Sequence, residues 1–220
     1  MSTAPTVLIM GPPGAGKGTQ AAHLVAQYQL RHVATGDLLR SAVAAESELG
    51  MLAKGFMEAG QLVPDEVTIG LLRELVQGLA SDEGVLLDGF PRTVAQAEAL
   101  EQMLVELGRA VDVALDIRVP DAVLIERLSG RWICRSCGTP FNVNSRPPQV
   151  AGVCDTCGGE LYQRADDTPH AVSNRLGVYL EQTAPVSSWY EHRGVLAVIN
   201  GNQALPEVAA ALDAAMPARA

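Results

Sequence analysis

Aromatic and basic side chains are scarce in this sequence of 220 residues, and cysteine occurs only four times. Phe, Trp and Tyr together make up 4% of the chain, but hydrophobic residues make up 48% and charged residues 19%. These last values are close to the globular average, which excludes a fibrous or wholly disordered chain. No apolar run approaches the about 18 residues of a membrane-spanning helix. The first residues, Met1–Thr6, lack the basic stretch of a secretory signal, so we expect a cytoplasmic protein.

The shortage of basic residues restricts the partners of the chain. Lys and Arg number 16 against 25 Asp and Glu, which gives a net charge of −9. Binding to nucleic acid without sequence preference depends on many Lys and Arg side chains that displace counterions, so we expect no nucleic-acid partner. A local basic cleft remains compatible with an acidic total.

Short apolar runs alternate with amphipathic helical patterns along most of the chain. This alternation predicts an α/β fold with a parallel sheet covered by helices. The length corresponds to about one and a half domains, which fits one core with an inserted module. The predicted strands are Thr6–Met10, Val85–Leu87, Val111–Ile117 and Val195–Ile199, and the predicted helices are Lys17–Tyr28, Asp65–Ala80, Thr93–Leu107 and Asp121–Leu128.

Two segments interrupt the alternation. Residues 34–63 are helical in pattern but contain four glycines, which indicates a small mobile subdomain. Residues 130–167 are rich in Gly, Pro, Asn, Arg and Cys and have no helical periodicity, so we interpret them as an inserted module. The core then comprises residues 1–33, 64–129 and 168–220.

A glycine-rich segment, Gly11–Thr19, connects the first predicted strand to the first predicted helix. Its backbone N–H groups and the helix N-terminus suit an anion, and Lys17 can reach terminal phosphates. The strict phosphate-loop pattern has Ser or Thr directly after the lysine, whereas Gly18 stands here and Thr19 follows. An ordinary turn is the alternative, but strand context, spacing and lysine all favour phosphate binding. The predicted nucleotide contacts are Gly14, Ala15, Gly16, Lys17, Gly18 and Thr19.

The four cysteines form two C-x-x-C pairs, Cys134 with Cys137 and Cys154 with Cys157. The spacing of the pairs is typical of a zinc site. Four thiolates complete a tetrahedron, so the zinc would be structural and not catalytic. Gly138 follows the first pair and allows a tight turn. Redox-active dithiols or unpaired thiols are the alternative.

Several motifs together resemble one family. The segment Gly-Lys-Gly-Thr is found in nucleoside monophosphate kinases, and the further motifs narrow the likeness to adenylate kinases of the long bacterial type with a zinc-containing lid. The motifs run in the expected order through most of the chain: Thr35–Arg40 (TGDLLR), Leu87–Arg92 (LDGFPR) followed by Gln96, Tyr162–Asp167, and Asn174–Leu176.

The resemblance implies a fold, a reaction and two metal ions. The fold would be a P-loop NTPase-type parallel sheet with an NMP-binding insertion at 34–63 and a zinc-stapled lid at 130–167. The reaction would be reversible phosphoryl transfer from Mg-ATP to AMP, giving two ADP and serving adenine nucleotide homeostasis. The cofactors would be Zn²⁺ in the lid and Mg²⁺ with ATP.

The resemblance also implies roles for charged residues. Phosphoryl transfer depends on positioning and on neutralising charge, which a set of fixed guanidinium groups provides. Arg40 and Arg92 would hold the AMP phosphate, and Asp88 would organise Mg²⁺ through water. The pair Asp166 and Asp167 would engage lid arginines. The implied catalytic residues are Lys17, Asp88, Arg92, Arg131, Arg164 and Arg175.

Both nucleotide sites follow from the same likeness. The implied AMP contacts are Thr35, Arg40, Gln61, Leu62, Val63, Gly89, Phe90, Pro91, Arg92, Gln96, Arg164 and Arg175. The implied ATP contacts beyond the phosphate loop are Arg131, Pro140, Phe141 and Gln203.

The sequence departs from the family pattern at one point and leaves other readings open. Trp132 stands where the family often has a second arginine, and we expect it to pack beneath the cysteine pairs. The four histidines match no metal or nucleophile pattern, so we interpret them as surface or packing residues.

The alternative functions are a kinase for another nucleoside monophosphate and a zinc-ribbon nucleic-acid module that uses ATP. A GTPase is remote, because no N-K-x-D segment is present. We expect a monomer, since two mobile insertions leave little surface for a partner.

Overall fold

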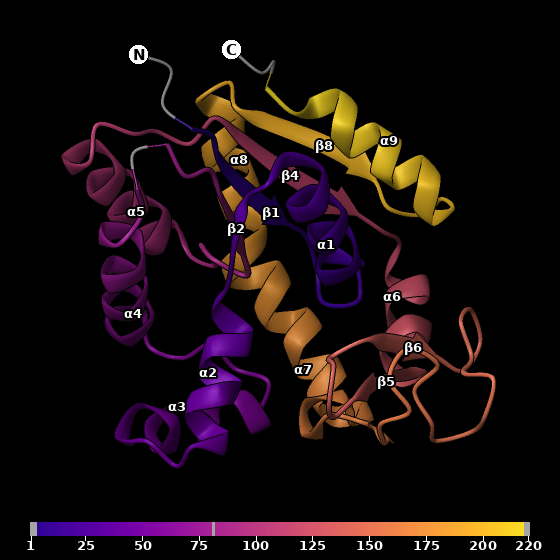
Figure 1. Cartoon of the computed structure of the whole chain (residues 1–220). Helices are drawn as coiled ribbons and strands as arrows, with labels where there is room; N and C mark the ends of the chain where they lie inside the picture. Colours follow the sequence, from indigo (N-terminus) through magenta and orange to yellow (C-terminus); the bar gives the residue numbers. More distant parts are fainter. Residues whose placement is uncertain (1–3, 81, 218–220) are drawn as a thin grey trace.

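The computed structural model describes residues 4–80 and 82–217. Its centre is a five-stranded parallel sheet (Figure 1) in the order β2-β3-β1-β4-β8. All five residues of β1 are buried, because a parallel sheet is covered on both faces. The strands are β1 (Thr6–Met10), β2 (Arg31–Ala34), β3 (Val85–Asp88), β4 (Val113–Arg118) and β8 (Leu196–Asn200).

Each face of the sheet has its own hydrophobic core. Val7 and Ile9 of β1 pack on one face with α1 (Lys17–Tyr28), α6 (Asp121–Ser129) and α9 (Leu205–Ala215). Leu8 and Met10 point to the other face. That face is covered by α4 (Asp65–Gln77), α5 (Val94–Glu106) and α8 (Ala184–His192). The predicted α/β class is therefore confirmed.

The predicted elements are present with ends shifted by no more than three residues, but several elements were not predicted. Strand β2 has a half-polar sequence, Arg-His-Val-Ala, and lies at the edge of the sheet, so no apolar run marks it. Helix α9 was also missed, because its alanine-rich sequence has no sharply apolar face.

Residues 35–58 form two helices that lie below the sheet in Figure 1, α2 (Thr35–Ala44) and α3 (Glu48–Glu58). Gly50 of α3 lies very close to α2: a Cβ there would lie 2.1 Å from the Ala42 carbonyl oxygen. Only glycine fits that approach. Leu39 of α2, Ala53 of α3 and Val63 form a small separate core, against which Val67 and Leu71 of α4 also pack.

The segment after α6 forms a second, antiparallel sheet in the order β6-β5-β7. Its strands are β5 (Arg131–Cys134), β6 (Pro140–Asn142) and β7 (Leu161–Tyr162). Phe141, Leu161 and two of the cysteines form its core, and Trp132 packs against them as expected. A short 3₁₀ turn, Ala165–Asp167, leads back to the main body.

A long, nearly continuous helical segment follows this turn. It consists of α7 (Pro169–Val178), a π-helical turn η2 (Tyr179–Thr183) and α8. The π-helical turn lies just before Pro185. Proline has no backbone N–H to donate within a helix, and the regular helical hydrogen bonds are interrupted at this point. The segment joins the small antiparallel sheet to the core (Figure 1). Among the helices of residues 4–80 and 82–217, none is long and apolar enough to cross a membrane.

Candidate active site

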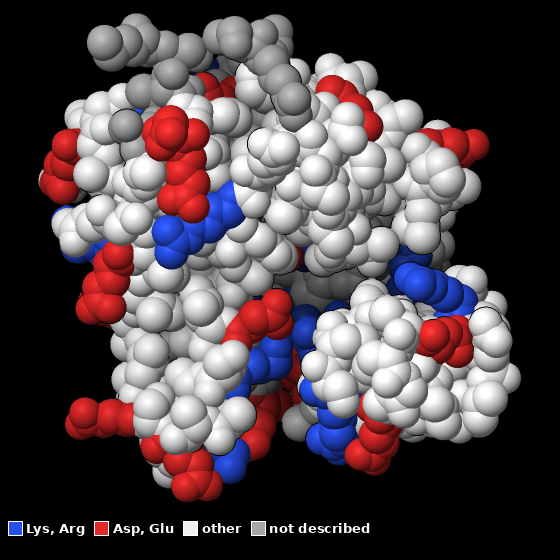
Figure 2. All heavy atoms as spheres, viewed as in Figure 1, with Lys and Arg blue, Asp and Glu red and all other residues white. Residues whose placement is uncertain are grey.

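The candidate site lies at the carboxyl ends of β1 and β3, where ligands of open α/β sheets usually bind. β1 leads into the loop that contains Lys17, and β3 ends at Asp88. One cavity extends from Lys17 to Arg92, Gln96 and Arg175. Figure 2 shows Lys and Arg atoms gathered in the hollow between the part formed by α2 and α3 and the part formed by the small sheet. The acidic total thus coexists with a basic cleft.

The loop before α1 is shaped by its glycines. Gly14 and Gly16 have φ values of 85° and 94°, in the region that favours glycine. Lys17 Nζ donates to the carbonyl oxygens of Gly11 and Pro12 at 2.7 and 2.9 Å. Burial, together with the nearby arginines, lowers the pKa of Lys17 to about 8. The nearby charge of Asp88 acts in the opposite direction and offsets part of this lowering.

Asp88 lies close to Lys17 and to a histidine. Burial alone would raise the pKa of the Asp88 carboxyl, but the contact with His32 and the charge of Lys17 hold it below its usual value. The distance from His32 Nε2 to Asp88 Oδ2 is 3.7 Å. Asp88 is therefore ionised at neutral pH, as a group that organises a cation must be.

Five arginines, Arg40, Arg92, Arg131, Arg164 and Arg175, lie close enough in the cleft to affect one another's charge. Burial and the charges of Arg175 and Arg40 lower the pKa of Arg92 to about 10. Burial and the charges of Arg40 and Arg131 lower the pKa of Arg164 to about 10 as well. All of them remain charged at neutral pH, so the cleft attracts polyanions strongly.

Two aspartates balance part of this charge. Asp167, whose side chain is 1% exposed, accepts a hydrogen bond from Arg131 Nε at 2.8 Å. Arg175 Nη1 lies 3.0 Å from Asp166 Oδ2 and 3.3 Å from Asp167 Oδ1. Asp167 thus contacts one lid arginine, Arg131, and both aspartates contact Arg175 of α7.

The cavity brings together most of the residues expected to contact AMP. Thr35 and Gln96 are each 2% exposed. Thr35 Oγ1 donates to the Gly89 carbonyl oxygen at 2.8 Å, which joins the start of α2 to the end of β3. Of the expected set, those lining the cavity are Thr35, Arg40, Gln61, Leu62, Val63, Gly89, Phe90, Pro91, Arg92, Gln96 and Arg175. Arg164 is outside the lining but lies 3.8 Å from Asp37.

The residues expected to contact the ATP base are less closely grouped. The Phe141 side chain is 3% exposed and packs inside the small sheet, so its ring is not free to stack on a base. Pro140 is half-buried beside it. Gln203 is exposed, in the loop between β8 and α9. Arg127 Nη2 donates to the Gly201 carbonyl oxygen in the same loop at 3.1 Å, so this loop adjoins the last turn of α6, the helix that precedes the small sheet.

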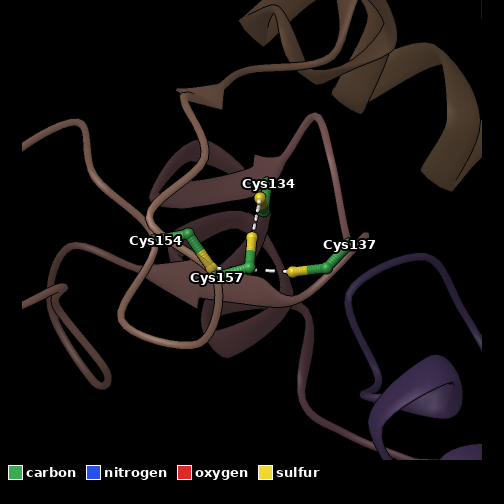
Figure 3. Close-up of side chains that lie close together, drawn as sticks. All are labelled: Cys134, Cys137, Cys154 and Cys157. Atoms are coloured by element: carbon green, nitrogen blue, oxygen red, sulfur yellow. Dashed lines mark hydrogen bonds between the residues drawn. The ribbon is translucent and has the colours of Figure 1, made fainter.

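The four cysteines converge at one end of the small sheet (Figure 3). Their sulfur atoms all lie within 4.8 Å of one another, with Cys134–Cys157 at 3.5 Å and Cys137–Cys154 at 3.6 Å. A tetrahedral zinc with Zn–S bonds of about 2.3 Å requires sulfur atoms about 3.8 Å apart. The donor set and its size therefore fit zinc, with no open coordination position.

Sequence reasoning missed some residues of the site. His32 is exposed, as its interpretation as a surface or packing residue predicts, but it also contacts Asp88, which was not predicted. Asp65 was read only as the start of a helix, yet it bonds to Gln96. Tyr179 and Thr183 of η2 line the cavity. No local motif marks these residues, because each meets its partner across a long stretch of sequence.

Comparisons with known proteins agree with this geometry. Residues 9–195 match the family model described as adenylate kinase. An adenylate kinase of Desulfitobacterium hafniense (strain DSM 10664 / DCB-2) is 53% identical over 201 residues, covering 91% of this chain and 93% of that protein. Adenylate kinases of Bacillus cytotoxicus and Bacillus cereus (strain AH187) are each 51% identical over 207 residues, covering 94% of this chain and 96% of those proteins. The chain therefore belongs to the adenylate kinase family, and the nucleoside monophosphate kinase activity of that family is its own.

Proposed function

We propose that Lys17 and the arginines around the cavity carry the phosphoryl transfer from Mg-ATP to AMP. The observation that carries this proposal is the gathering of Lys17, Arg40, Arg92 and Arg175 around one cavity at the end of the sheet. Fixed positive groups lower the barrier by stabilising charge on the transferring group without reorganising. No covalent intermediate is needed, because the acceptor phosphate attacks directly.

The two phosphate-binding groups have separate tasks. Arg40 and Arg92 hold the AMP phosphate, while the loop from Gly14 to Thr19 holds the ATP phosphates. Lys17, which belongs to that loop, exchanges its contacts with the carbonyl oxygens of Gly11 and Pro12 for phosphate oxygens. Three further arginines surround the phosphates of both nucleotides: Arg131, Arg164 and Arg175. Their approach excludes water that would compete with AMP.

Asp88 holds Mg²⁺ through bound water in this proposal. Its ionised state and its place beside Lys17 support that role. Mg²⁺ keeps several waters when bound in proteins, and it supplies charge neutralisation at the ATP phosphates. His32 keeps the carboxylate oriented toward the loop.

Different parts of the protein contact the adenine of AMP and the adenine of ATP. Buried Thr35 and Gln96 contact the adenine of AMP, together with the segment Gln61–Val63. Pro140, the backbone of Phe141 and the loop with Gln203 contact the adenine of ATP.

The four cysteines bind one structural Zn²⁺. The zinc joins the two C-x-x-C turns, and among the described residues the core around them is small, with Phe141, Leu161 and Trp132 beside the buried cysteines, so the metal supplies stability that this core lacks. We further propose that residues 34–63 and 130–167 move as units relative to the core of residues 1–33, 64–129 and 168–220. The enzyme would act as a cytoplasmic monomer.

A coupled assay of ADP formation tests the assignment. Mg-ATP is supplied with AMP, CMP, UMP or GMP as acceptor, using wild type and Lys17→Ala. We expect strong preference for AMP and a loss of at least about a hundredfold in kcat for the variant. Near-normal transfer by Lys17→Ala would overturn the site, and preference for another base would overturn the roles of Thr35 and Gln96.

A further inference from the structure

The side-chain amide of Gln96 is held by two hydrogen bonds within the protein. Its oxygen accepts from the Arg92 backbone N–H at 2.7 Å, and its nitrogen donates to Asp65 Oδ1 at 2.6 Å. An amide offers two donor hydrogens and two acceptor lone pairs. One N–H and one lone pair of Gln96 therefore remain available at the wall of the cavity.

These two bonds select one of the two orientations of the amide. If the amide turned over, its oxygen would face the Asp65 carboxylate and its NH₂ group would face the Arg92 N–H. Both contacts would be repulsive. Because Gln96 is 2% exposed, water would not make up for the two lost hydrogen bonds. The bond to Asp65 is charge-assisted, so it is the stronger of the two.

Asp65 is itself fixed in place. It is the first residue of α4, and its other oxygen accepts from Thr93 Oγ1 at 2.8 Å. The same Thr93 oxygen caps α5 by accepting from the Gln96 backbone N–H at 3.1 Å. Asp65, Thr93 and Gln96 thus form one network between the starts of two helices.

The orientation of an amide matters for reading a purine. On its Watson–Crick edge adenine donates from the 6-amino group and accepts at N1, whereas hypoxanthine accepts at O6 and donates from N1–H. An amide that matches adenine must turn over to match hypoxanthine. We propose that Asp65 is a positioning residue that locks Gln96 in one orientation and thereby makes the acceptor site select a 6-aminopurine over a 6-oxopurine. This inference rests on the proposed contact between Gln96 and the acceptor base.

The test compares AMP and IMP as acceptors, because these nucleotides differ only in the groups at position 6 and N1. Asp65→Asn keeps the shape of the side chain, but its own amide can face Gln96 with either oxygen or NH₂. We expect the ratio of kcat/KM for AMP to that for IMP to fall about tenfold, chiefly through a higher KM for AMP. If Asp65→Asn does not fold, Asp65→Ser replaces it, since serine retains a partner for Thr93.

Two further variants separate the possible causes. Glu66→Gln removes the same charge from the exposed neighbouring position in the first turn of α4, and we expect an unchanged ratio. Gln96→Ala should lower the ratio, and Asp65→Asn should lower it no further in that background.

An unchanged ratio in Gln96→Ala would refute the proposed base contact itself. A lowered ratio in Gln96→Ala with an unchanged ratio in Asp65→Asn would overturn only the positioning role. Equal losses for both acceptors in Asp65→Asn would show a merely structural role and would also overturn it.

Discussion

Arg131 and Asp167 stand at the two ends of the segment 130–167 and are joined by an ion pair, in which Arg131 Nε donates to Asp167 Oδ2 at 2.8 Å. The Asp167 carboxylate is almost completely buried and also contacts Arg175 of α7. One carboxylate therefore ties both ends of the lid to the long helical segment behind the cleft. Its two partners are also residues that we propose for phosphate binding.

Asp167→Asn should destabilise this junction. Removing the charge leaves two partly buried arginines with Asp166 as their remaining anion, and breaking a buried ion pair costs about 3–5 kcal/mol. We expect a lower Tm in calorimetry and faster proteolysis within residues 130–167. Glu160→Gln is the control, because Glu160 forms an exposed pair with Arg135. Equal Tm values for the two variants would contradict the prediction.

The pKa of Lys17, lowered to about 8 by burial and neighbouring arginines, makes ATP binding dependent on pH. The ammonium form binds phosphate, and bound phosphate raises the pKa of Lys17. As the pH rises through 8, the free enzyme loses this proton, so the affinity for ATP should fall and binding should take up a proton. Calorimetric titration at pH 8.5 in two buffers of different ionisation enthalpy measures that uptake. Lys17→Arg stays charged at this pH and should take up none at this site.

Close packing at Gly50 predicts a sharp contrast between two glycines of α3. Gly50→Ala would place a Cβ 2.1 Å from the Ala42 carbonyl oxygen, whereas a Cβ at Gly55 meets nothing within 4 Å. Gly50→Ala should therefore cost about 1–3 kcal/mol and raise the KM for AMP, because α2 carries Thr35 and Arg40. Gly55→Ala should be neutral or stabilise by up to about 1 kcal/mol. Thermal unfolding and AMP kinetics check both, and similar behaviour of the two would count against the α2–α3 crossing.

The cysteine cluster predicts one zinc ion per chain. The four sulfur atoms lie within 4.8 Å of one another, as a metal bound by four thiolates requires. Metal analysis should find one equivalent, and Cys154→Ser should lose it. A loss of about 3 kcal/mol in the lid would lower Tm by about 6–12 °C. Unchanged Tm after complete removal of the metal would contradict a stabilising role.

Local motifs explain why much of the site could be predicted. The phosphate loop is one short stretch in which glycine, lysine and the following helix all act on the same anion. The cysteine pairs are also local, and a metal needs only to join two turns. Contacts between distant residues were not predictable in this way. Asp65 and Gln96 are 31 residues apart, and His32 meets Asp88 only because β2 pairs with β3.

The sequence alone determined the fold class, the phosphate loop, the cysteine cluster and the family, because each depends on periodicity or on residues close together in the chain. The tertiary structure decided which charges neutralise which. It buried Asp167 between Arg131 and Arg175, turned the Phe141 ring into the lid core, and placed Asp65 against Gln96. Such pairings depend on how helices and strands pack in three dimensions. A linear pattern carries no record of that packing.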